Sequence, residues 1–262
     1  MLSCVVRVLF IGDVFHKPGL AVMRSYLARH RESFDFIIAN GENVAGGRGI
    51  TRKHFQQMRS WGVDVVTLGN HAWDGTEVLQ LLEESGHLVR PINCPPGTPG
   101  LGSAAFQTKS GGRIGVAQAM GRIFMEPLDC PFRALDALLE RWPEHEPLIV
   151  DFHGEATSEK RVMGYHLAGR VAAVIGTHTH VQTADERIWK GTAYITDVGM
   201  TGDQNSAIGM RFEEVHHRFV TRLPKRYRPA EGAGVLCGVV FEIGGTRATS
   251  IERIQWQCEG GG

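Results

Sequence analysis

The sequence predicts an α/β fold in which two β-sheets pack face to face between helices, a four-layer α/β/β/α sandwich. Short apolar runs end repeatedly in glycine, as strands do when they stop in tight turns. In the first half of the chain these runs alternate with segments of helical spacing. The second half adds so many further strands that two sheets fit the pattern better than one.

The first half is expected to form parallel strands, because its apolar runs and predicted helices alternate in the βαβ manner. These runs stop at Gly12, Gly41 and Gly69, and the helices cover residues 20–30, 51–61 and 76–84. Thr51 is the expected N-cap of the second helix, and Gly62 its stop. In the second half we expect a helix at 132–141 and strands at 102–108, 113–119, 148–152, 171–175, 193–197, 234–243 and 249–257.

Composition limits the classes of protein that fit. The chain has 262 residues, 42% of them hydrophobic, which is enough for one substantial core. Neither a charged linker nor an internal repeat divides it, so we predict a single domain over residues 1–262. Basic and acidic residues number 28 each, and the formal charge is zero. This balance argues against a dedicated surface for long nucleic acids and makes any phosphate recognition local.

Cellular location follows from two further features. The five cysteines are widely spaced and contain no C-x-x-C pair, which indicates reduced thiols. No apolar run approaches the roughly 18 residues of a membrane span. A cytoplasmic protein that does not enter the membrane is therefore the expectation.

Side chains with metal-binding atoms follow five of the apolar strands. They are Asp13, Glu42 and Asn43, Asn70 and His71, His153, and His178 and His180. In α/β layers the crevice at the carboxyl ends of the strands is the usual ligand site. Oxygen and imidazole donors without thiolate suit Mn, Fe or Zn rather than a structural tetrathiolate zinc. Two ions could share seven of these eight groups.

Each of these residues also has a simpler interpretation when it is taken alone. Asp13 fits the N-cap of the following helix, and His153 fits a buried histidine bonded to a backbone carbonyl. The pair His178 and His180 points more strongly to a metal, because residues two apart in extended backbone face the same side. The combination is therefore more specific than any single member.

In their order along the chain, these groups resemble the calcineurin-like metallophosphoesterases. Within that superfamily the chain is similar to the bacterial YmdB-type phosphodiesterases from about residue 5 to 255. The segments that carry the resemblance are Asn40-Gly41-Glu42-Asn43, Gly69-Asn70-His71-Ala72-Trp73-Asp74, residues 151–160 (DFHGEATSEK), residues 178–185 (HTHVQTAD) and residues 195–202 (ITDVGMTG). The resemblance implies a metallophosphoesterase-like sandwich of two mixed sheets.

The chain departs from the superfamily pattern at its first metal site. That pattern begins Asp-x-His, whereas the residue two after Asp13 is Phe15, which cannot bind a metal. The general pattern bridges its metals with Asp, and the matching residue here is Glu42. The YmdB-type resemblance implies that Glu42 bridges two ions and that Asn43 replaces the missing histidine. One ion would then have Asp13, Glu42, Asn43 and His180 as ligands, and the other Glu42, Asn70, His153 and His178.

The implied cofactors are two divalent or mixed-valence transition metal ions, with Fe or Mn favoured and Zn also compatible with the donors. Two ions roughly 3.5–4 Å apart activate a bridging hydroxide that attacks phosphorus in line. By resemblance, His71 is the catalytic acid or transition-state stabiliser. The alternative is that His71 only orients Asn70 or Asp13 by a hydrogen bond.

The predicted function is hydrolysis of a small phosphodiester, and the resemblance implies cyclic nucleotides, 2′,3′-cyclic and also 3′,5′-cyclic. Two alternatives remain open: a phosphomonoesterase or protein phosphatase, and a metal-loaded regulatory binding protein whose hydrolysis is incidental. Residues 199–214 follow a strand with weak periodicity and are interpreted as a lid or a subunit contact. The resemblance also suggests a homo-oligomer, a dimer or a tetramer.

Overall fold

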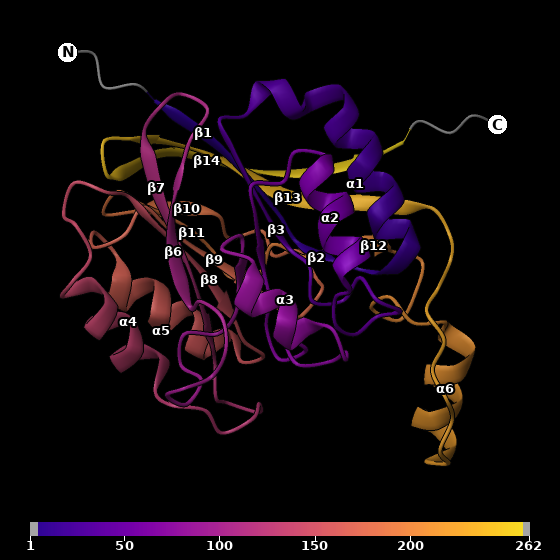
Figure 1. Cartoon of the computed structure of the whole chain (residues 1–262). Helices are drawn as coiled ribbons and strands as arrows, with labels where there is room; N and C mark the ends of the chain where they lie inside the picture. The colour runs from indigo at the N-terminus through magenta and orange to yellow at the C-terminus, as the bar shows by residue number, and fades with distance from the viewer. Residues whose placement is uncertain (1–4, 259–262) are drawn as a thin grey trace.

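Two β-sheets form the middle of the molecule, and helices cover their outer faces (Figure 1). The computed structural model describes residues 5–258. Within this range the larger sheet has eight strands, in the order β2 (Asp13–Val14), β12 (Met200–Asp203), β13 (Gly234–Gly244), β1 (Val6–Ile11), β3 (Phe36–Asn40), β4 (Val65–Thr67) and β5 (Leu88–Val89), with β14 (Arg247–Gln257) beside β13. The smaller sheet has six, in the order β10 (Arg187–Trp189), β11 (Thr192–Ile195), β9 (Ala173–Thr177), β8 (Leu148–His153), β7 (Arg113–Met120) and β6 (Ser103–Gln107).

The helices divide between the two outer faces. The larger sheet is covered by α1 (His16–His30), α2 (Arg52–Ser60) and α3 (Val78–Glu84), and the smaller sheet by α4 (Pro131–Leu139) and α5 (Thr157–Leu167). A 3₁₀ turn at Arg31–Ser33 follows α1. Helix α6 (Phe212–Thr221) projects from the body of the molecule (Figure 1). The predicted α/β/β/α sandwich of two mixed sheets is therefore confirmed.

Strand periodicity explains the four layers, because alternate side chains of a strand face opposite sides of its sheet. Along β1, Leu9 and Ile11 pack against α1, α2 and α3. Val8 and Phe10 point the other way, into the core between the two sheets. In the smaller sheet Ile149 belongs to that same inner core, whereas the alternating neighbours Val150 and Phe152 pack against α4 and α5.

The predicted parallel strands of the first half are present, since β1, β3, β4 and β5 pair in parallel. The backbone N–H of His54 donates to the hydroxyl of Thr51, so the predicted cap of α2 is also confirmed. Helix α1 begins at His16, earlier than predicted, because Pro18 is compatible with a first helical turn. The alternative of Asp13 as an N-cap is wrong, since that cap is Phe15.

Several elements were not expected from the sequence. These are the helix α6 and the short strands β2, β5, β10 and β12. The segment 199–214 therefore contains a strand of the larger sheet, a loop and the start of α6. Among the described residues, no helix combines the length and the apolar character needed to cross a bilayer. The described cysteines are unpaired, and Cys4 lies outside the described residues.

A buried ion pair holds the loop that follows β9. The Lys160 ammonium of α5 donates to the carbonyl of Thr177 at 2.6 Å and to Asp197 Oδ2 at 2.5 Å. Both charged side chains are 1% exposed. The same carboxylate accepts the backbone N–H groups of Thr179 and Gly199. The pair therefore ties α5, the end of β9 and the start of β12 together directly beneath residues 178–180.

We expect Lys160→Met to destabilise the protein by about 3–5 kcal/mol, because the Asp197 carboxylate would stay buried without its cation. Urea unfolding monitored by circular dichroism measures this loss. Lys17→Met is the matched control, since the pair of Lys17 with Glu231 is largely exposed and should change stability little. A loss below about 1 kcal/mol for Lys160→Met would contradict this role.

Candidate metal centre

The polar side chains that follow the strands meet at one rim of the two sheets. Glu42 and Asn43 follow β3, and Asn70 follows β4 in the larger sheet. His153 ends β8 of the smaller sheet, and residues 178–180 directly follow β9. Because these strands run in parallel within each sheet, their carboxyl ends lie at a common edge. The predicted convergence of distant segments is therefore present in the structure.

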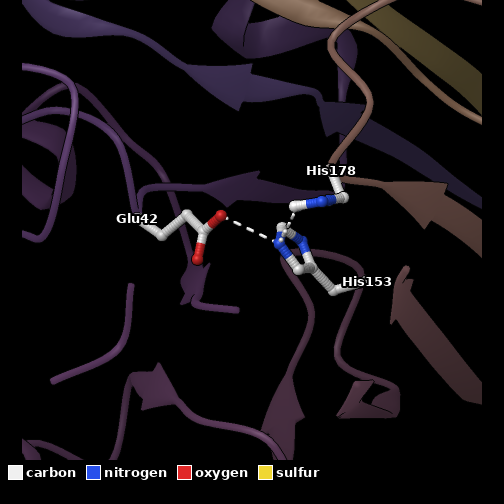
Figure 2. Close-up of side chains that lie close together, drawn as sticks. All are labelled: Glu42, His153 and His178. Carbon is white, nitrogen blue, oxygen red and sulfur yellow. Dashed lines mark hydrogen bonds and ion pairs between the residues drawn. The ribbon is translucent and has the colours of Figure 1, made fainter. Parts of the chain in front are cut away.

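His153 lies at the centre of the first group of side chains. Its imidazole is fully buried, and its Nε2 lies 2.9 Å from Glu42 Oε1, 2.9 Å from Asn70 Oδ1 and 3.0 Å from His178 Nδ1. Figure 2 shows Glu42 and His178 approaching the same edge of the His153 ring. Three lone-pair donors thus face a nitrogen that carries at most one proton.

This excess of lone pairs fits a cation. Ligand atoms of Glu42, His153 and His178 all lie within 4.8 Å of one another, which is close enough for a single metal ion. Gly69 permits the approach of the two sheets here. A Cβ on Gly69 would lie 2.4 Å from the His153 ring, so any larger residue would displace the imidazole.

The charges in this group are strongly coupled. Burial would raise the pKa of Glu42, but the neighbouring His153 outweighs it and lowers this pKa to about 2. Burial would likewise lower the pKa of His153, but the carboxylates of Glu42 and Asp13 raise it to about 9. Burial and the charge on His153 lower the pKa of His178 to about 3. Without a metal, a proton on His153 therefore supplies the positive charge that the site requires.

The second group of side chains comprises Asp13, Asn43 and His180. His180 Nε2 lies 3.9 Å from Asp13 Oδ1, and its Nδ1 lies 3.0 Å from the carbonyl oxygen of Ile208. Donation from Nδ1 to that carbonyl leaves the lone pair of Nε2 directed at Asp13. Burial raises the pKa of Asp13, which is fully buried.

Two buried oxygens in this second group have no hydrogen-bond partner among the described residues. They are Asp13 Oδ1 and Asn43 Oδ1. The Asn43 amide is oriented by its Nδ2, which donates to the carbonyl of Gly47 at 3.0 Å. Because buried acceptors are normally satisfied, two such oxygens fit a cation, and one of them, Asp13 Oδ1, faces the His180 imidazole. Glu42, His153 and His178 therefore form one cluster, and His180 lies beside Asp13, while the two predicted ligand sets stay predictions.

The backbone that carries His178 and His180 is not extended, contrary to the expectation from their spacing. Strand β9 ends at Thr177, and the two histidines have φ of +99° and +66°. Positive φ is unfavourable for residues other than glycine. The consequence is that the rings diverge, so that His178 faces His153 and His180 faces Asp13.

His71 is held beside the first group by two contacts. Its backbone N–H donates to Glu42 Oε2 at 2.9 Å, and its Nδ1 lies 2.7 Å from Asp74 Oδ2. Each carboxylate oxygen of Glu42 therefore has its own partner, Oε1 at His153 and Oε2 at the backbone of His71. Asp74 also accepts from Arg48 Nε at 3.0 Å. The side chain of His71 lines the adjoining cavity, where its Nε2 is the ring nitrogen left for a ligand.

A buried network behind His153 was missed in the sequence. His153 Nδ1 lies 2.8 Å from the hydroxyl of Thr177, and that hydroxyl donates to Asp151 Oδ1 at 2.7 Å. Thr67 donates to the other oxygen of Asp151. Burial raises the pKa of Asp151 to about 6 despite these bonds. The hydroxyl is therefore an acceptor for His153 Nδ1–H, which leaves Nε2 to face the site.

A signal for this network was present in the sequence. Asp151 lies two residues before His153 on the same strand, and alternate residues of a strand share a face. Glu155 and Asp74 lie in the two sequence segments that also contain His153 and His71. Glu155 Oε2 lies 3.1 Å from His178 Nε2, the nitrogen that points away from His153.

A cavity of about 710 Å³ opens above both groups. Its floor includes Glu42, Asn43, His71, His178 and His180. Arg48 and Glu155 also line it, and much of the remaining wall is apolar and aromatic. The apolar and aromatic side chains of the wall are Phe15, Ile208, Met210, Val215, Phe219 and Tyr227. This volume lies within the range of small-molecule sites.

Comparison with known proteins places the chain in a family. The family model described as "YmdB-like protein" matches residues 9–254. A relative from Bacillus subtilis (strain 168), named 2′,3′-cyclic-nucleotide 2′-phosphodiesterase, is 46% identical over 254 residues, which cover 95% of this chain and 96% of the relative.

Two solved structures are also similar. A hypothetical protein from Thermus thermophilus has 48% identity and a TM-score of 0.92, with coverage of 96% of this chain and 99% of that one. A novel phosphatase from Mycoplasma pneumoniae has 32% identity and a TM-score of 0.91, with coverage of 97% and 94%. With a family model and a relative of this identity across nearly the whole chain, the protein belongs to the YmdB-like family.

Proposed function

We propose that the protein is a metal-dependent phosphodiesterase that hydrolyses 2′,3′-cyclic nucleotides to monoesters. The observation that carries the proposal is the surplus of buried lone pairs at the rim of the sheets, on Asp13, Asn43 and around His153 Nε2. The Bacillus subtilis relative is named for the same reaction and aligns with almost the entire chain.

The ligand assignment divides the rim into two sites. Glu42, Asn70, His153 and His178 would hold one ion, and Asp13, Glu42, Asn43 and His180 the other. Glu42 would be the shared ligand, because its carboxylate is buried and its charge acts on Asp13 of one group and His153 of the other. The imidazole and oxygen donors include no thiolate, which favours Fe or Mn and also admits Zn.

The bound ions would supply Lewis-acid stabilisation of the phosphoryl oxygens and lower the pKa of a water molecule. The chain itself provides the proton for the leaving group. Asp74 orients the His71 ring through Nδ1, so that Nε2 is available to protonate the departing ribose oxygen. Hydrolysis of the bond from phosphorus to O2′ then leaves a 3′-phosphate.

Other assignments remain predictions. Hydrolysis of 3′,5′-cyclic nucleotides belongs to this proposal as a secondary activity, and a homo-oligomer, a cytoplasmic location and a single domain stay expectations from the sequence. The similar structure from Mycoplasma pneumoniae is named a phosphatase, so phosphomonoester hydrolysis is the alternative reaction. Rates with bis-aryl and mono-aryl phosphates distinguish the two reactions. A regulatory binding role would be favoured if an inactive His71 variant kept its effect in cells.

Removal of metal should abolish hydrolysis. We expect chelated, desalted protein to lose measurable turnover of adenosine 2′,3′-cyclic phosphate, and added Mn²⁺ or Fe²⁺ to restore it. Elemental analysis should find about two ions per chain, as the two-site assignment requires. Undiminished turnover by protein that contains no transition metal would refute the metal dependence.

Substitutions at the acid should separate chemistry from metal binding. His71→Gln is expected to lower kcat by roughly 10²–10⁴ and to leave the metal content unchanged, because its side chain is not assigned as a ligand. Asp74→Asn should cost a smaller factor of about 10–100, since it only orients the ring. Steady-state kinetics with elemental analysis of the same samples measures both. Wild-type kcat in His71→Gln would remove this residue from the mechanism.

A further inference from the structure

Helix α6 forms the first half of an arm that extends from the metal rim. The arm comprises residues 209–230, and its base is closed by backbone hydrogen bonds from Ala230 to Gly209 and from Arg211 to Arg228. Arg228 also forms an ion pair with the buried carboxylate of Glu214. The arm is therefore a defined structural unit, and it stands clear of both sheets in Figure 1.

The arm is basic although the whole chain is neutral. Residues 211–228 contain six Lys or Arg and two Glu, a formal charge of +4. Arg228 is paired with Glu214, but Arg218, Arg222, Lys225 and Arg226 have no carboxylate within 4.0 Å in residues 5–258. These four cations give the arm a local affinity for anions that the overall composition conceals.

Two hollows meet on this arm. The cavity above the metal rim is bounded by Phe219 and Tyr227. A second hollow of about 310 Å³ shares these two aromatic residues and is otherwise lined by Arg218 and Arg222. The Arg218 guanidinium lies 5.4 Å from the centre of the Tyr227 ring, which holds it in place. Phe219 is 70% exposed, so its ring is accessible to a ligand.

Aromatic rings that alternate with guanidinium groups are typical of surfaces that bind single-stranded nucleic acid. The first hollow offers a reaction centre and an aromatic wall for one nucleoside. The second offers two guanidinium groups, which suit a phosphate. A mononucleotide would use only the first hollow, and the second would have no ligand.

We propose that the substrate is the 3′ end of a short oligoribonucleotide that terminates in a 2′,3′-cyclic phosphate. The terminal nucleotide occupies the cavity above the metal rim, and the preceding phosphodiester binds Arg218 and Arg222. This inference rests on the proposed function and deepens it. Water adds to phosphorus, the bond to O2′ breaks, O2′ takes a proton, and a 3′-phosphate end remains. A reaction that cleaves RNA by attack of the 2′-hydroxyl supplies such ends.

The test compares adenosine 2′,3′-cyclic phosphate with the dinucleotide ApA that ends in the same cyclic phosphate. We expect wild-type kcat/KM to be about tenfold higher for the dinucleotide, and its dependence on log salt to be steeper by about 0.7 for the one added phosphate. The double variant Arg218→Gln/Arg222→Gln should lose both effects. Its kcat/KM for the mononucleotide should remain within about twofold of wild type.

The matched control is Arg133→Gln/Arg141→Gln, which removes two exposed arginines at and just beyond α4, a helix on the smaller sheet. It should keep the dinucleotide preference. A second readout does not need turnover: fluorescence anisotropy of a 5′-labelled triadenylate with a 3′-phosphate should show tighter binding to wild type and the control than to the arm variant.

Each failure has a distinct meaning. Equal kcat/KM for the two substrates, or a preference that survives in the arm variant, would overturn the oligonucleotide site and leave the proposed function standing. A change of sedimentation mass in the arm variant would overturn it in favour of a contact with a second copy of the chain. If metal-loaded wild type hydrolysed neither substrate, the proposed function itself would fail.

Discussion

The site depends on one buried nitrogen, His153 Nε2, which three lone-pair donors approach within 3.0 Å. No arrangement of protons satisfies all three contacts, because the nitrogen holds one proton at most. The opposite ring nitrogen is engaged by the Thr177 hydroxyl, which in turn bonds Asp151. The fold thus places an imidazole lone pair, a carboxylate and an amide oxygen where a cation resolves their mutual repulsion.

The histidine loop shows how the fold sustains this arrangement. His178 and His180 have positive φ, a conformation that costs of order 1–3 kcal/mol at each such residue. The buried pair of Lys160 and Asp197 holds the backbone of Thr177 and Thr179, the residues on either side of His178. The two divergent rings serve different groups of ligands as a result. The buried ion pair therefore helps to fix the directions in which the His178 and His180 rings point.

Much of the fold could be predicted because strand and helix periodicities are local properties of the sequence. The runs before Gly12, Gly41 and Gly69 became strands β1, β3 and β4, whose carboxyl ends lie at the predicted rim. The clustering of the seven candidate ligands was predictable for the same reason. Their roles as ligands remain a proposal, supported by their positions.

Features that depend on contacts between distant segments could not be predicted. The prediction of extended backbone at His178 was wrong. The positive φ there accompanies the hydrogen bond from the neighbouring Thr179 N–H to Asp197, a contact between distant segments and not a local preference. The strand period places Asp151 on the same face as His153, but its partner Thr177 comes from a different strand, so the network itself could not be read from the sequence. The arm of α6 was hidden by a net charge averaged over the whole chain. Each of these features depends on which segments lie together in the fold, and overall composition does not show this.

The central claim is that one carboxylate, Glu42, is shared by two ions at the rim of the sheets. Anomalous X-ray diffraction from crystals of the Mn²⁺-loaded protein tests it most directly. The account predicts two peaks roughly 3.5–4 Å apart, one beside His153 and His178 and one beside Asp13 and His180, with Glu42 between them. A single peak at Glu42, or metal bound only at other residues, would contradict it.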